Sequence, residues 1–166
     1  MAENSQRKFA VMGMNTFKIA NKIMSNQKIC RLLKYPVRDP FNTEKYENVD
    51  GLDLMGEQIL IVPKIFDEST EKMSYITAIF DDFVVNQFNP EFKMATIRFD
   101  IACPYDEWLL DENSLRPYLI MQEIDNIFNQ GELSGIGNLQ FHRADALTLS
   151  PQIGGYSMRY KNNEFN

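Results

Sequence analysis

Histidine, cysteine and tryptophan are scarce in this chain of 166 residues, which contains one, two and one of them respectively. A catalytic triad or a Cys–His pair would have to use His142, and the chain contains no glycine-flanked nucleophile elbow. Neither Cys30 nor Cys103 lies at chelate spacing from His142, which argues against a zinc site. We therefore expect no catalytic residue, no metal site and no cofactor, and two reduced core thiols.

Segments that bind nucleotides or direct a chain to a membrane are also missing. No G-x-x-x-x-G-K-[S/T] segment occurs, and no G-x-G-x-x-G segment follows a predicted strand. No basic segment with an apolar run of roughly 7–15 residues stands at the start, as in a signal peptide. No apolar run approaches the roughly 18 residues of a transmembrane helix. We expect no membrane partner, and a protein that stays in the cytoplasm where it is made or in a particle assembled there.

Basic residues are outnumbered, with 17 Lys and Arg against 23 Asp and Glu and a net charge of −6. This balance argues against a surface that follows a phosphate backbone throughout. Residues 1–40 contain eight basic and two acidic residues, or +6, whereas the remaining 126 contain nine and 21, or −12. Such a chain can pack head to tail with copies of itself or bind an acidic partner. A solvated helix beside an acidic body explains the same pattern without a partner.

Apolar spacing predicts helices first and strands afterwards. The expected elements of the first third are a mobile arm at residues 1–13, a helix from Asn15 or Thr16 to Met24, a short helix capped by Asn26, and a long irregular polar loop at 36–57. The expected later elements are a strand buried on both faces at 59–62, strands at 73–85 and 94–103 joined by a hairpin-like connection at 86–92, a helix at 115–129, and short strands at 138–142, 145–149 and 156–161. Helices and strands do not alternate strictly. The order predicts a single α+β domain over 1–166, with a largely antiparallel mixed sheet, helices on one face and a long β-hairpin.

Two kinds of residue suggest a surface that binds a partner. One is a basic stripe with i+3 spacing, and the other is a set of aromatic residues expected in loops or at strand ends. Together they are Lys28, Arg31, Lys34, Tyr46, Phe83, Phe88, Phe92 and Trp108.

Two other functions remain open from the residues alone. Asp82, Glu91 and Lys93 resemble the carboxylates and lysine of a nuclease that uses divalent metal ions, although such triples arise by chance. The basic stripe could instead make the protein a monomeric adaptor for an acidic partner.

The order of elements over residues 94–161 resembles the neck and tail-terminator proteins of tailed bacteriophages. The similar stretch starts with the alternating strand Thr96-Ile97-Arg98-Phe99-Asp100-Ile101. A loop with a tryptophan follows, then the helix Leu115–Asn129, then short strands that close on Gly154-Gly155-Tyr156-Ser157-Met158-Arg159-Tyr160. The earlier segment Leu32-Leu33-Lys34-Tyr35-Pro36, followed by a long loop with Asp39-Pro40, is also similar to neck proteins of phages that infect Gram-positive hosts.

This resemblance implies a structural protein of the virion and no catalysis. It implies a hexameric ring at the head-proximal end of the tail, which ends the tail tube and joins it to the head. The implied partners are further copies of the chain, the tail tube protein and a head-closure or other neck protein. Genomic DNA would pass through the lumen without specific binding. Another ring of the neck, such as a head-closure or adaptor protein, is the alternative within this group.

Overall fold

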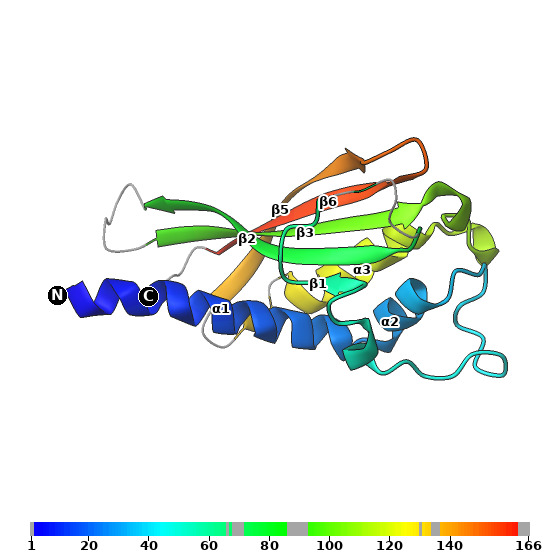
Figure 1. The fold of residues 1–166 in the computed structure, drawn as a ribbon, viewed down its shortest axis with the longest axis horizontal. Coiled ribbons are helices and arrows are strands. Elements are labelled where there is room, and N and C mark those ends of the chain that lie inside the picture. Colours follow the sequence, from blue (N-terminus) through cyan, green and yellow to red (C-terminus); the bar gives the residue numbers. More distant parts are fainter. Residues whose placement is uncertain are drawn as a thin grey trace.

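The computed structural model describes residues 2–65, 67, 72–85, 93–129, 131–133 and 137–162, and it has the expected α+β fold (Figure 1). The α-helices are α1 (Ala2–Met24), α2 (Gln27–Lys34) and α3 (Arg116–Phe128). The strands are β1 (Ile59–Leu60), β2 (Tyr75–Val85), β3 (Lys93–Pro104), β4 (Glu132–Leu133), β5 (Gly137–Thr148) and β6 (Ile153–Asn162). Short 3-10 helices are η1 (Gly51–Leu54), η2 (Tyr105–Glu107) and η3 (Asp111–Asn113).

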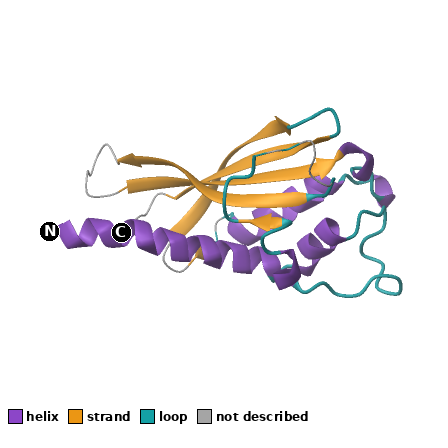
Figure 2. Ribbon diagram, in the orientation of Figure 1, coloured by secondary structure: helices purple, strands orange, loops and turns teal. Residues whose placement is uncertain are grey.

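The sheet has six strands in the order β1-β2-β3-β6-β5-β4. The β1–β2 pair is parallel, and the other pairs are antiparallel. The β2–β3 pair runs out to Val85 opposite Lys93, which confirms the long hairpin. All three α-helices lie along one face of the sheet (Figure 2), as the sequence predicts.

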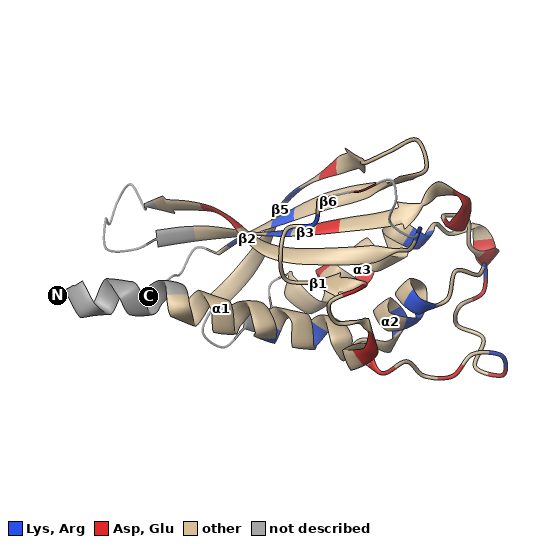
Figure 3. Ribbon diagram, in the orientation of Figure 1, with Lys and Arg blue, Asp and Glu red and all other residues tan. Residues whose placement is uncertain are grey.

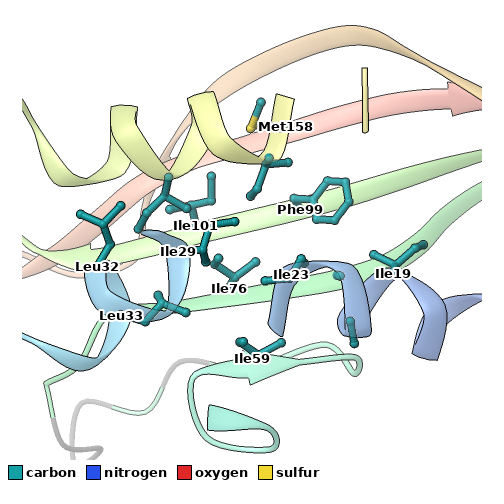
Figure 4. Packing of buried hydrophobic residues seen from close by; sticks show 14 of the residues in the cluster. Ile19, Ile23, Ile29, Leu32, Leu33, Ile59, Ile76, Phe99, Ile101 and Met158 are labelled. Carbon is teal, nitrogen blue, oxygen red and sulfur yellow. The ribbon is translucent and has the colours of Figure 1, made fainter. Parts of the chain in front are cut away.

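The core lies between that face and the helices (Figure 4). Alternate residues of β3 point into it, and Ile97, Phe99 and Ile101 have no exposed surface. The helices contribute buried side chains from their inner faces, among them Ile19, Ile23, Ile29, Leu32, Leu33, Ile120, Ile124 and Phe128. Full burial of such a side chain stabilises a fold by roughly 1.5–3 kcal/mol. The alternation in the sequence thus identifies the core face of the sheet correctly.

The first helix is longer than predicted. Residues 2–13, expected to be an arm without regular structure, are helical, and the predicted start at Asn15 or Thr16 is wrong. Met12 is buried in a small cluster with Ala95 of β3 and Phe80 of β2. This support comes from strands far away in the sequence, so local periodicity does not reveal it. No helix in the described part of the chain is long and apolar enough to cross a membrane.

The strand predictions need two corrections. The segment 59–62 is a strand only at Ile59 and Leu60, and Val62 is 57% exposed. Both residues of β1 are buried as predicted, Ile59 in the main core and Leu60 in a small cluster with Tyr75, Ala102 and Ile153. The predicted burial therefore holds for the strand itself, which is shorter than expected, and not for Val62. The predicted strands at 138–142 and 145–149 are one strand, β5, with a register shift between Phe141 and Arg143. A β-bulge of this kind reverses the in–out alternation and so imitates a break between strands.

Both cysteines are free and buried, as predicted. Burial raises the pKa of the Cys30 thiol to about 11. Burial likewise raises the pKa of the Cys103 thiol to about 11.

The raised pKa values of the two thiols predict that the protein loses stability in alkali. In the unfolded chain they lose protons from about pH 8.5 upward, whereas in the folded chain they stay protonated until about pH 11. Deprotonation therefore favours the unfolded state, and we expect the free energy of unfolding to fall as pH rises through this interval. Urea titrations of the wild type and a Cys30→Ala/Cys103→Ala variant measure the effect. The variant should lose less stability over the interval, and equal slopes would contradict the prediction.

Candidate interaction surfaces

The outer face of the sheet, opposite the helices, carries charged side chains in ordered rows. Pairing across β2, β3, β6 and β5 places Ile79, Arg98, Arg159 and Arg143 in one row. The rows on either side are Thr77, Asp100, Ser157 and Asp145, and Asp81, Thr96, Lys161 and Gln140. Three neighbouring arginines thus lie between rows that contain aspartates. These three residues, Arg98, Arg159 and Arg143, are called here the arginine row.

Ion pairs neutralise the arginine row. Arg98 contacts Asp81 and Asp100, each at 3.1 Å. Arg159 contacts Asp145 at 2.9 Å, and Asp145 also contacts Arg143 at 3.2 Å. The side chains of Arg98 and Arg159 are only 25% and 22% exposed, so water screens these pairs less than it screens free surface charges.

Side chains of β3 and β6 hold the Asp100 carboxylate in place. Ser157 Oγ donates to Asp100 Oδ1 at 2.6 Å, and Arg98 Nε donates to Asp100 Oδ2 at 3.1 Å. Beside this network a hollow of about 500 Å³ is lined by Asp81, Asp82, Thr96, His142, Arg143, Arg159 and Lys161. The face therefore carries a pattern of paired positive and negative charges, and it can select a partner by that pattern.

One end of the molecule projects beyond the body formed by α2, α3 and the centre of the sheet. It consists of residues 10–18 of α1 and residues 81–85 and 93–96 of the β2–β3 hairpin, and it is called here the extension (Figure 1). Large apolar side chains are exposed on it: Val11 at 43%, Met14 at 64%, Phe17 at 55%, Phe83 at 45% and Val84 at 44%. Grouped exposed apolar side chains are typical of contact surfaces between proteins.

The long loop at 36–57 is held against the body by side chains of α2. Arg31 is only 5% exposed, and it donates to Pro40 O at 3.2 Å, Tyr46 O at 3.0 Å and Asn48 Oδ1 at 3.1 Å. Its prediction as part of an exposed basic stripe is wrong, because the loop folds over the guanidinium group. The loop is thus ordered within a single chain.

The other members of the predicted basic stripe do not form one surface with Arg31. Lys28 Nζ lies 3.1 Å from Glu123 Oε1 of α3, and Lys34 is exposed. Tyr46 is half-buried, with its ring centroid 4.7 Å from that of Tyr35. The loop residue Tyr46 therefore packs on Tyr35, directly after the end of α2, instead of projecting from the loop.

A second buried arginine, Arg116, was not singled out by the sequence. It has no exposed surface and donates to backbone carbonyls of Leu32, Tyr35, Val37 and Glu107. Three of these carbonyls lie at the end of α2 or just beyond it, and the fourth is in η2. Arg116 therefore joins the start of α3 to the start of the long loop.

The predicted aromatic residues have different surroundings. Trp108 is half-buried and donates from Nε1 to Cys103 O at 3.1 Å, so it covers the end of the core. Phe83 is exposed on the extension, with its ring centroid 6.3 Å from that of Phe80. Phe88 and Phe92 lie outside the described residues.

The structure places one member of the possible nuclease triple completely. Asp82 is exposed at the bulge in β2, with a φ of 56°. Glu91 and the Lys93 side chain lie outside what the structure describes, although the Lys93 backbone pairs with Val85. Among the described residues no group of three or more His, Cys, Asp or Glu could hold a metal ion.

Comparison with known protein families places most of the chain in one of them. The family model YomW matches residues 26–162, which begin just before α2 and end with β6. No curated protein matches the chain. No solved structure matches it either.

Proposed function

The chain belongs to the YomW family, a phage-derived family, and from that premise we propose that it is a structural protein of the phage particle. In this proposal it forms a hexameric ring at the head-proximal end of the tail. The ring ends the tail tube and joins it to the head or neck. The protein is assembled in the host cytoplasm and remains in the virion.

The observation that carries this proposal is the extension. Five large apolar side chains are exposed there at 43–64%. Covering the remaining exposed area of several such side chains would favour association, because burial of apolar surface contributes about 25 cal/mol per Å². A projecting arm of this kind suits subunits that reach across to a neighbour in a ring.

The proposed partners are further copies of the chain, the tail tube protein, and a head-closure or other neck protein. Genomic DNA would pass through the lumen without being bound specifically. The net charge of −6 is compatible with this last point, because a predominantly acidic protein repels the phosphate backbone.

Electron microscopy of the purified protein, alone and mixed with tail tubes of the corresponding phage, tests the proposal. We expect the protein alone to form ring-shaped particles. In the mixture we expect tubes that carry a ring at one end and no longer elongate. Binding to isolated heads instead of tubes would assign the ring to the head side of the neck. A protein that stays monomeric and leaves tube length unchanged would contradict the proposal.

A further inference from the structure

The outward face of α1 is both apolar and basic. Met12, Ile19 and Ile23 face the core and are buried, whereas Met14 is 64% exposed and Phe17 is 55% exposed. Residues two or five positions from a core position lie on the opposite side of a helix, so these two large side chains point away from the body. The outward face is defined here by Val11, Met14, Phe17, Lys18 and Lys22.

The charged residues that α1 contributes to this face are basic. No acidic residue occurs between Asn4 and Arg38, a segment that contains eight basic residues. Lys18 and Lys22 are both exposed beside the apolar residues of the outward face. A partner surface that offers apolar side chains and negative charge together would complement these residues.

The opposite end of the molecule offers both apolar surface and negative charge. A hollow of about 490 Å³ lies between the start of the long loop and η3, and it is called here the acidic end. Among its lining residues are Arg38, Asp39, Phe41, Asp111, Glu112 and Leu119. Arg38 lies 3.4 Å from Asp111, which leaves a net negative charge on the hollow, and Phe41 is 39% exposed.

The two surfaces cannot meet within one molecule. The exposed part of α1 and the acidic end lie at opposite ends of the longest axis (Figure 1). Figure 3 shows basic residues along α1 and α2 and acidic residues gathered at the end that carries η2, η3 and the long loop. Pairing of two outward faces with each other would place lysines against lysines.

We propose that the outward face of α1 binds the acidic end of a second copy of the chain. This inference rests on the proposed ring and identifies the contact that builds it. Because the two surfaces differ, the contact is heterologous, and each subunit offers one of each. Repeated around a rotation axis, it generates a closed ring.

Two charge variants and a control test the contact by sedimentation velocity. Met14→Glu/Phe17→Glu replaces two apolar side chains of the outward face with charged ones. Asp111→Lys/Glu112→Lys reverses two charges of the acidic end. Leu52→Glu is the control, since Leu52 is an apolar residue of η1 that is 69% exposed and belongs to neither surface. Circular dichroism establishes that each variant is folded.

We expect the wild type and the control to form the same ring, and each double variant to associate at least about 100-fold more weakly. An equimolar mixture of the two double variants should form a 1:1 complex and nothing larger, because it retains one intact outward face and one intact acidic end. Assembly of either double variant like the wild type, or a mixture that stays monomeric, would overturn this contact and leave the proposed ring standing. A wild type that is monomeric at every concentration would overturn both.

Discussion

Replacing Arg116 with methionine is expected to lower the free energy of unfolding by about 4 kcal/mol. The guanidinium group is fully buried and donates to four backbone carbonyls. Methionine fills a similar length of chain but donates no hydrogen bond. Each carbonyl left buried and unsatisfied costs about 1–3 kcal/mol. A loss of this size is a large part of the roughly 5–15 kcal/mol that stabilises a typical domain, and urea unfolding at pH 7 measures it.

Arg143→Met is the matched control, since the same atoms change in a different environment. Arg143 is 55% exposed, and its partner Asp145 is 51% exposed. Exposed ion pairs contribute about 0–1 kcal/mol, so we expect a small effect. Similar losses in the two variants would show that Arg116 does not connect α2, α3 and the long loop in the way described.

Replacing Gly155 with alanine is expected to destabilise the fold by about 3 kcal/mol. Gly155 pairs with Ala102 in β3, and a Cβ atom at this position would lie 1.9 Å from the backbone oxygen of Ile101. A backbone carbonyl within a sheet cannot move aside as a flexible side chain can. Overpacking of this kind costs about 1–3 kcal/mol and occasionally more, and the fixed backbone places Gly155 at the upper end.

Gly13→Ala is the control for Gly155→Ala, and it should have the opposite sign. Gly13 lies within α1, and no heavy atom lies within 4 Å of a Cβ built there. Alanine in a helix interior is favoured over glycine by about 0.8–1.0 kcal/mol, so this variant should be more stable than the wild type. Thermal unfolding of both variants compares them directly, and a stable Gly155→Ala variant would contradict the close approach of β6 to β3.

The sequence predicts those parts of the fold that depend on local alternation. Ile97, Phe99 and Ile101 are buried as predicted, because side chains of a strand point alternately to opposite faces. Asn26 caps α2 as predicted, accepting from the backbone N–H groups of Lys28 and Ile29. The alternation of inward and outward side chains is interrupted at His142 for the same physical reason. The β-bulge in β5 changes the face to which the following side chains point.

The roles of the arginines could not be predicted from the sequence. Arg31 and Arg116 donate mainly to backbone carbonyls, and residue types do not show where a backbone carbonyl will lie in the fold. Arg116 reaches Leu32 and Val37, about 80 residues earlier in the chain. The arginine row is a different case. Arg98 and Arg159 stand on the polar sides of two predicted strands, and only the register of β3 with β6, which puts them opposite each other, was missing.

The molar mass of the purified protein in solution, measured by light scattering over a range of concentrations, tests most directly whether this protein acts by assembling with copies of itself. A ring predicts one discrete species at a fixed multiple of 19.3 kDa. That species should dissociate in the Met14→Glu/Phe17→Glu variant. A mass of 19.3 kDa at every concentration, with or without tail tubes, would contradict the central claim.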